Sequence, residues 1–218
     1  MQQVSASLAP SQIDALKRLG AATIHEAQKQ TGSLTSAIKP LNPKARLVGR
    51  ALTVDAMPGD NLVIHQALTR ARPGDVLVVN AKGYTEAGPW GDILTLAAQK
   101  AGVAGLVIDG CVRDASAIIE MAFPVFARGL CIKGTMKNQP GLINVAIVCG
   151  GVRIEPGDVV VGDRDGVVVV PKDHLDDVLV AAKQREEAEA ALRRELKAGR
   201  STIELLNLGH VLTRLGIA

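Results

Sequence analysis

The sequence predicts an α/β fold built on a βαβαβ core with parallel neighbouring strands. Between residues 47 and 130, apolar runs typical of strands alternate with segments that have helical spacing. Residues 105–108 are apolar without alternation, which is typical of a parallel strand covered on both faces. This order of elements brings the carboxyl ends of the strands to one edge, where open α/β sheets bind their ligands.

The first half of the chain contains its elements in a clear order. They are helices over 11–20 and 23–29, a strand over 47–56, a helix over 61–71, a strand over 76–79, and a helix that begins at 91. Ser11 can cap the first helix, and Asp60 of a Pro-Gly-Asp turn can cap the helix that follows it. The turn Pro73-Gly74-Asp75 precedes the next strand in the same way, which indicates reused turn chemistry.

Beyond Pro124 the pattern becomes mostly β. Strands are expected over 125–127, 145–148, 159–161 and 167–170. The last two flank a Gly-Asp-Arg-Asp-Gly segment that predicts a hairpin. A helix of about seven turns is then expected from Asp173 to Lys197, ended by Gly199, with a terminal helix over 203–215.

Composition limits the classes of function. A chain of 218 residues that is 47% hydrophobic can bury a sizeable core in one domain with an appendage. Aromatic residues make up only 2%, and 25 basic residues are interspersed with 22 acidic ones, so we expect no nucleic-acid partner. Three cysteines without a CxxC pair, no signal pattern and no apolar run of about 18 residues predict a cytoplasmic protein that does not enter a membrane.

Charged residues gather at two strand-to-helix turns. Asp109, Arg113 and Asp114 follow one buried strand, and Asp92 opens the next helix upstream, directly after Gly91. A guanidinium fork suits a carboxylate, free N–H groups at a helix start suit an anion, and one or two carboxylates with water suit Mg²⁺ or Mn²⁺. Each residue alone could be an ordinary cap or ion pair. Two such turns side by side favour an anion and metal site.

Two other groups compete for the chemistry. Asn61 and His65 are four residues apart on one face of a helix that starts at the same strand-end edge. A lysine nucleophile that forms a Schiff base is the second alternative, with Lys82, Lys133 and Lys137 as its candidates. None of these lysines lies in an apolar run that would lower its pKa, so this alternative is the weaker one.

The long helix carries an acidic residue on its apolar stripe. Leucine, valine and alanine side chains from 175 to 196 share one face, and Glu189 falls in the middle of it. A carboxylate there needs a partner, or the stripe must leave the domain at that point. We expect the helix to reach a neighbouring subunit, although a stripe that frays into solvent explains Glu189 equally well.

Three segments have a familiar pattern: Gly91-Asp92-Ile93-Leu94, then Asp109-Gly110-Cys111-Val112-Arg113-Asp114 after its strand, then residues 123–129. From about Thr23 to Pro171 the chain resembles the family of the regulator of ribonuclease activity A and the class II pyruvate aldolases. It looks most like the 4-hydroxy-4-methyl-2-oxoglutarate / 4-carboxy-4-hydroxy-2-oxoadipate aldolases of aromatic compound degradation. Residues 83–88 and the long tail helix carry that finer resemblance.

The resemblance implies a swivelling β/β/α-like sandwich and homotrimers that can pair as homohexamers. Residues 1–172 would form one α/β catalytic domain, and residues 173–218 a helical extension that packs on a neighbouring subunit.

It also implies roles for single residues. Asp114 would hold Mg²⁺ or Mn²⁺, and Arg113 the keto-acid end of the substrate. Asp92 would order water at the metal, while Asp109 would only brace its loop. The substrate carboxylate would bind the backbone amides of Gly91, Asp92, Ile93 and Leu94, with Asn61 and His65 lining the pocket. A neighbouring subunit would supply Glu189, or else Glu186.

The activity implied is that of a carbon–carbon lyase. A metal-dependent retro-aldol cleavage would release pyruvate and a second keto acid from a 4-hydroxy-2-oxo di- or tricarboxylic acid, with oxaloacetate decarboxylase activity as a side reaction. A non-catalytic regulator that binds an RNA-processing ribonuclease is the main alternative, but its members end near the last hairpin. A menaquinone-type methyltransferase is a weaker one, because no Gly-rich turn suited to a nucleoside methyl donor is present. The sequence leaves open which acid, which metal, and trimer or hexamer.

Overall fold

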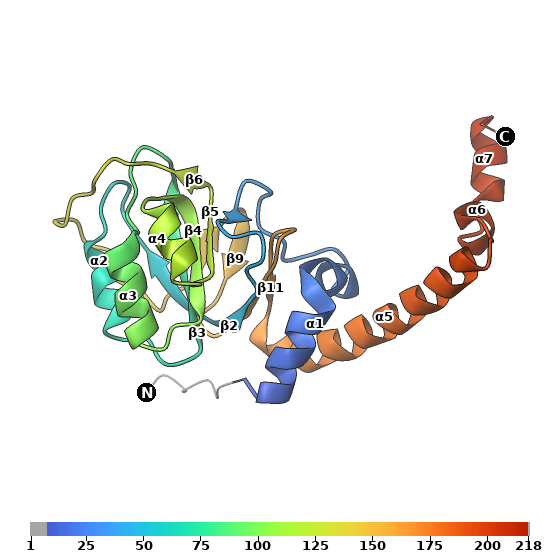
Figure 1. Cartoon of the computed structure of the whole chain (residues 1–218), viewed down its shortest axis with the longest axis horizontal. Helices are drawn as coiled ribbons and strands as arrows, with labels where there is room; N and C mark the ends of the chain where they lie inside the picture. Colours follow the sequence, from blue (N-terminus) through green and yellow to red (C-terminus); the bar gives the residue numbers. More distant parts are fainter. Residues whose placement is uncertain (1–7, 218) are drawn as a thin grey trace.

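The computed structural model describes residues 8–217 and has a mixed α/β sheet at its centre (Figure 1). The strands are β1 (Lys39–Pro40), β2 (Leu47–Asp55), β3 (Asp75–Tyr84), β4 (Gly105–Val112), β5 (Val125–Ala127), β6 (Gly129–Leu130), β7 (Leu142–Ile143), β8 (Ile147–Cys149), β9 (Val152–Ile154), β10 (Val159–Gly162) and β11 (Val167–Val170). The helices are α1 (Pro10–Ala27), α2 (Leu62–Leu68), α3 (Asp92–Lys100), α4 (Ala115–Glu120), the 3₁₀ turn η1 (Lys172–His174), α5 (Leu175–Lys197), α6 (Thr202–Leu205) and α7 (Gly209–Leu215).

The parallel core confirms the expected α/β class. The main sheet has the order β1-β5-β4-β3-β2-β10-β11, and β2, β3, β4 and β5 are mutually parallel neighbours. Val78 at the centre pairs with Thr53 on one side and Val107 on the other. Because these strands are covered on both faces, their interior positions are nearly all apolar.

Two apolar layers cover the sheet. Helices α2, α3 and α4 pack on one face, where Ile64, Leu94 and Ile118 meet buried strand residues such as Leu77. The β8–β9 hairpin and residues 34–38 cover the other face, around the buried ring of Phe126. Side chains alternate across a strand, so neighbouring residues of one strand serve different layers.

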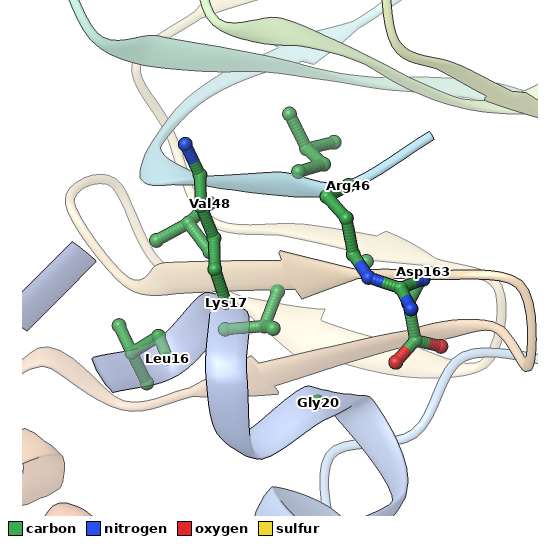
Figure 2. Close-up of a pocket in the computed structure, with 9 residues that line it drawn as sticks. Leu16, Lys17, Gly20, Arg46, Val48 and Asp163 are labelled. Atoms are coloured by element: carbon green, nitrogen blue, oxygen red, sulfur yellow. The ribbon is translucent and has the colours of Figure 1, made fainter. Parts of the chain in front are cut away.

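A third apolar cluster joins α1 and α5 to the β10–β11 hairpin that was expected at residues 162–166. Helix α1 bends at Gly20, where φ is 77°, so the two helices expected over 11–20 and 23–29 form one interrupted helix. The N–H of Ala21 donates to Asp163 Oδ2 at 2.9 Å, which caps the second part of the helix (Figure 2). The shallow depression drawn there encloses no room for a water molecule and shares no residue with the predicted site.

Helix α5 leaves the domain after about three turns, since Arg185 in its third turn still pairs with Glu26 of α1. Leu175, Val178 and Ala182 are buried against α1 and the hairpin, whereas Leu196 is 39% exposed. Figure 1 shows the rest of α5 projecting from the domain with α6 and α7 at its far end. The single terminal helix expected over 203–215 is divided into α6 and α7. Asn207, which lies between them, has a positive φ of 52°. No helix within residues 8–217 is both long and apolar enough to cross a membrane.

Strand β4 is longer than the sequence indicated. Pairing with β6 joins Cys111 to Gly129 and Val112 to Leu130, so residues 109–112 belong to the strand and not to a loop. Only Arg113 and Asp114 of the charged hexapeptide lie in the turn before α4. This difference decides which of its charged groups are free to bind a ligand.

Candidate functional site

Gly91 and Asp114 bring two strand-to-helix turns into contact. Gly91 ends the segment between β3 and α3, and Asp114 ends the turn between β4 and α4. A Cβ atom at position 91 would lie 2.3 Å from Asp114 Oδ2 and 3.3 Å from Arg113 Nε. The absence of a side chain at Gly91 therefore makes room for both charged groups, as expected for two turns at one sheet edge.

Asp114 has one carboxylate oxygen engaged and one open. Its backbone is left-handed, with φ 57°, a conformation that Asp tolerates better than most residues. Oδ2 accepts the N–H of Asp92 at 3.4 Å and lies 3.4 Å from Arg113 Nε. Oδ1 has no hydrogen bond or ion pair within residues 8–217, and 37% of the side chain is exposed.

Asp92 supplies a second carboxylate beside it. Oδ1 accepts the N–H of Ile93 at 2.7 Å, while Oδ2 has no partner in the described part of the chain. Those residues contain no group of three or more His, Cys, Asp or Glu side chains arranged around a metal. Two half-open carboxylates with access to water fit Mg²⁺ or Mn²⁺, which keep several water ligands, and do not fit a closed zinc site.

Arg113 adds a guanidinium to this group, in contact with Asp114. The side chain is 45% exposed, and its backbone N–H donates to the carbonyl of Trp90 at 2.9 Å. Gly88 leaves room for it, because a Cβ there would lie 3.1 Å from Arg113 Cβ. Apart from the contact with Asp114, the fork is free to bind a carboxylate.

Asp109 is not part of this group. Its side chain points to the opposite face of β4, where it forms an ion pair with Arg128 and accepts the N–H of Gly150 at 2.9 Å. Only 10% of the side chain is exposed, and neighbouring Cys149 has its pKa raised to about 12 by burial and by this carboxylate. Asp109 thus ties strand β4 to Arg128 and to the β8–β9 turn at Gly150, and the loop that the sequence led us to expect it to brace is part of the strand.

Asn61 connects α2 to the site, and His65 follows it one turn later. The Asn61 side chain is buried and donates to the carbonyl of Pro89 at 2.9 Å, while its Oδ1 has no partner among residues 8–217. His65 is exposed, and its pKa is lowered first by partial burial and then by the charge of Lys137. Pro89 lies two residues before Gly91, so Asn61 supports the segment that carries the site.

The segment over 131–139 adjoins the site, and the sequence indicated only Lys133 and Lys137 within it. Lys133 O accepts the N–H of Gly88 at 2.9 Å, and the buried Asp60 carboxylate accepts the N–H groups of Asn138 at 2.8 Å and Gln139 at 3.1 Å. Burial would raise the pKa of Asp60, but these donors, the Leu62 N–H and Lys137 outweigh it and hold the pKa below its ordinary value. The Pro-Gly-Asp turn suggested only a helix cap at Asp60, and nothing local indicates the distant partners.

Two of the three lysine candidates are held in ion pairs. Lys82 forms an ion pair with Asp55, and Lys133 pairs with Glu86. The hydrogen bond that Lys133 donates to Glu86, and the negative charge of Glu86, raise the pKa of Lys133, which is the opposite of what a Schiff-base amine requires. Lys137 lies near Asp60 and His65 on the exposed segment.

Glu189 does not join these residues within one chain. Its carboxylate contacts Arg185 Nε at 3.1 Å and Arg193 Nη2 at 2.8 Å, both on α5. Glu186 lies on the same helix, three residues earlier. Helices α3 and α4 lie at one end of the molecule, and α5 projects from the other (Figure 1). The structure therefore brings together Gly91, Asp92, Arg113 and Asp114 and leaves both glutamates apart.

Known proteins are similar to this chain in sequence and in structure. A protein of Halalkalibacterium halodurans named "Putative 4-hydroxy-4-methyl-2-oxoglutarate aldolase" is 45% identical over 164 residues, which are 75% of this chain and 78% of the relative. The crystal structure of Streptomyces coelicolor RraAS2, titled an unusual member of the RNase ES inhibitor RraA family, has a TM-score of 0.76 and 30% identity, over 86% of this chain and 98% of that one.

A third relative bears another name. A structure from Geobacillus kaustophilus titled S-adenosylmethionine:2-dimethylmenaquinone methyltransferase has a TM-score of 0.65 and 36% identity, over 71% of this chain and 96% of that one. The family model described as RraA-like, Aldolase/RraA, matches residues 21–169, which include both strand-to-helix turns. The chain belongs to the RraA-like family of aldolase and RraA proteins.

Proposed function

We propose that this protein is a divalent-metal-dependent pyruvate aldolase. Its substrate would be a 4-hydroxy-2-oxo di- or tricarboxylic acid, of the type of 4-hydroxy-4-methyl-2-oxoglutarate or 4-carboxy-4-hydroxy-2-oxoadipate. The observation that carries the proposal is the convergence of the open Arg113 fork with two half-open carboxylates, Asp92 and Asp114, at one sheet edge. The aldolase name of a 45% identical relative supports it.

The residues at this sheet edge would take distinct parts in a retro-aldol cleavage. Arg113 would bind and orient the 2-oxo acid end, since the N–H groups of Asp92 and Ile93 at the start of α3 already donate to carboxylates. Asp114 would hold Mg²⁺ or Mn²⁺, with Asp92 ordering a water molecule beside it, and the ion would supply Lewis-acid polarisation of the 2-oxo group. Asp92 Oδ2 accepts, through one water molecule, the proton that leaves the C4 hydroxyl.

Loss of that proton turns C4 into a carbonyl as the C3–C4 bond breaks. The electron pair of that bond moves toward the C2 oxygen and forms the enolate of pyruvate. The positive charge of Arg113 lies where this negative charge develops, so it stabilises the transition state more than the ground state. Return of the proton to C3 releases pyruvate, and decarboxylation of oxaloacetate would pass through the same enolate.

A neighbouring subunit would complete the site with Glu189 or Glu186. Helix α5 projects from its own domain, and its apolar stripe continues to Leu196 after the contacts with α1 end. A homotrimer or homohexamer would cover that stripe and bring a glutamate to another chain's Arg113. Three free cysteines agree with a reducing compartment such as the cytoplasm.

The decisive experiment is a substrate screen with the Mg²⁺-loaded protein. Pyruvate release from several 4-hydroxy-2-oxo acids and from oxaloacetate is measured before and after EDTA treatment. We expect turnover of at least one acid, abolished by EDTA and restored by Mg²⁺. Full activity in metal-free protein, or borohydride trapping of pyruvate on a lysine, would refute the proposal.

A second candidate function rests on the likeness to RraAS2. A regulator would bind an RNA-processing ribonuclease and would not need the open carboxylates. A pull-down with such a ribonuclease and aldolase assays on the same sample separate the two. Ribonuclease binding without pyruvate release from any acid would favour the regulator.

A further inference from the structure

Trp90 and Thr95 form a buried relay behind the site, and neither has a place in the proposed chemistry. We propose that they are positioning residues that fix the Gly91–Asp92 peptide against Asp114 and Arg113. The inference deepens the proposed function and rests on it. A series of hydrogen bonds leads from Trp90 through Thr95 to the carbonyl of Gly91, and that carbonyl shares its peptide unit with the N–H of Asp92.

The hydrogen bonds of this relay all donate in the same direction, from Trp90 through Thr95 to Gly91. The indole Nε1–H of Trp90 donates to Thr95 Oγ1 at 2.8 Å, and the Thr95 hydroxyl donates to the carbonyl of Gly91 at 2.9 Å. An indole N–H can only donate, so it occupies an acceptor position of the hydroxyl and directs the hydroxyl proton to Gly91. The backbone N–H of Thr95 donates to the same carbonyl at 3.0 Å.

Two donors on the Gly91 carbonyl set the orientation of the whole peptide. A peptide unit is planar and trans, so its N–H points opposite to its C=O. The N–H of that unit belongs to Asp92 and points at Asp114 Oδ2, 3.4 Å away. Hydrogen bonds in a chain also polarise one another, so the relay strengthens this N–H as a donor.

Trp90 also holds the other half of the site. Its backbone carbonyl accepts the N–H of Arg113 at 2.9 Å, while its indole controls Gly91 through Thr95. One residue thus couples the turn that carries Arg113 and Asp114 to the start of α3. The indole is fully buried and stacks on Phe123 with ring centroids 6.2 Å apart, which leaves it little freedom to turn.

A threonine that bonds to its own helix carbonyl is common and often only structural. Two features distinguish Thr95 from that case. Its hydroxyl is fully buried and receives a second hydrogen bond from Trp90, and the carbonyl it binds belongs to the residue directly before Asp92. Removal of the hydroxyl would leave the indole N–H unpaired and free the Gly91 carbonyl to tilt.

The chain offers a matched control. Thr53 is also fully buried and donates to a backbone carbonyl, that of Val145, at 2.6 Å. That bond lies on the face of the sheet that the β8–β9 hairpin covers, with no link to Gly91 or Arg113. Thr53→Val and Thr95→Val therefore delete the same kind of bond from equally buried sites. Thr95→Ser keeps the hydroxyl and tests for rescue.

The first measurement is residue-resolved amide hydrogen exchange of the full chain, which does not depend on the reaction. We expect the Asp92 N–H to exchange about tenfold faster in Thr95→Val, the size expected from one lost buried hydrogen bond. Thr95→Ser and Thr53→Val should leave it within about twofold of the wild type. Unchanged exchange in Thr95→Val, or equal acceleration in Thr53→Val, would overturn the positioning role.

The second measurement is the dissociation constant for oxalate, a mimic of the pyruvate enolate, with Mg²⁺-loaded protein. Thr95→Val should weaken oxalate binding by about tenfold, the effect of losing one hydrogen bond. Thr95→Ser, which keeps the hydroxyl, should restore the affinity. Equal binding by Thr95→Val and the wild type would refute the inference. If the wild type neither binds oxalate nor releases pyruvate, the proposed function fails, and hydrogen exchange still decides the relay.

Discussion

Gly91 and Asp114 lie so close that a Cβ atom on Gly91 would be 2.3 Å from Asp114 Oδ2. The φ of Gly91 is −150°, an extended conformation open to any residue, so space and not backbone freedom requires glycine. We predict that Gly91→Ala lowers kcat/KM for pyruvate release by about 100-fold, because displacing a reacting group by about 1 Å has that effect. Steady-state kinetics on the substrate found in the screen measures it.

Gly209→Ala is the control for that change. Gly209 starts α7, and a Cβ there would meet nothing within 4 Å. Its kcat/KM should equal that of the wild type. A Gly91→Ala enzyme as active as Gly209→Ala would show that Asp114 tolerates displacement.

Asp114→Asn tests the metal without disturbing the fold. Asn tolerates the left-handed backbone at φ 57° as well as Asp does, and it has nearly the same shape. The free energy of unfolding should change by less than about 0.5 kcal/mol. The affinity for Mg²⁺ should fall by at least about tenfold, because a neutral amide oxygen replaces an anionic ligand. Calorimetric titration of Mg²⁺ measures the affinity, and unchanged affinity would remove Asp114 from the metal site.

Arg113 and Arg128 should separate activity from stability. Arg113→Ala removes a 45% exposed guanidinium, so it should abolish most pyruvate release and leave urea unfolding almost unchanged. Arg128→Ala leaves the Asp109 carboxylate unpaired at 10% exposure, which should lower the free energy of unfolding by up to about 3 kcal/mol. The reverse pattern, with activity lost only in Arg128→Ala, would contradict the assigned roles.

His65 should stay neutral at neutral pH. Partial burial and then Lys137 lower its pKa below the ordinary 6.5, so protonation favours the unfolded chain. The contribution of His65 to stability is complete above the unfolded-state pKa and is lost as the pH falls toward the folded-state pKa. We predict that Lys137→Ala raises the pKa of His65, as measured by NMR titration. Lys133→Ala is the control, since Lys133 pairs with Glu86.

Mixed oligomers test the glutamate from a neighbouring subunit. Glu189→Gln and Arg113→Ala proteins should each release little pyruvate alone. After joint unfolding and refolding, some sites would combine an intact Arg113 with an intact Glu189 from another chain, so activity should return in part. Glu187→Gln, on the opposite side of α5, should stay active. A Glu189→Gln protein that is active by itself would direct the search to Glu186. Two inactive proteins whose mixture does not recover would contradict a site shared between subunits.

The sequence alone was enough to predict the parallel core and the pair of turns that carry Gly91, Asp92, Arg113 and Asp114. Those features are local or periodic: an apolar run predicts a buried strand, and a charged turn after it lies at the strand's carboxyl end. Parallel pairing of β3 with β4 then leaves the two turns as neighbours.

Tertiary structure decided which of these charges are free. Asp109 and Asp114 are equally acidic in the sequence, but the extra pairing of β4 with β6 turns Asp109 toward Arg128 and Gly150. Asp60 and Thr95 acquire their roles only from partners elsewhere, since Asp60 binds residues 138 and 139 and Thr95 receives the Trp90 indole. Hydrogen bonds between distant segments leave no periodic trace in a sequence, so the supports behind the site appear only when the chain has folded.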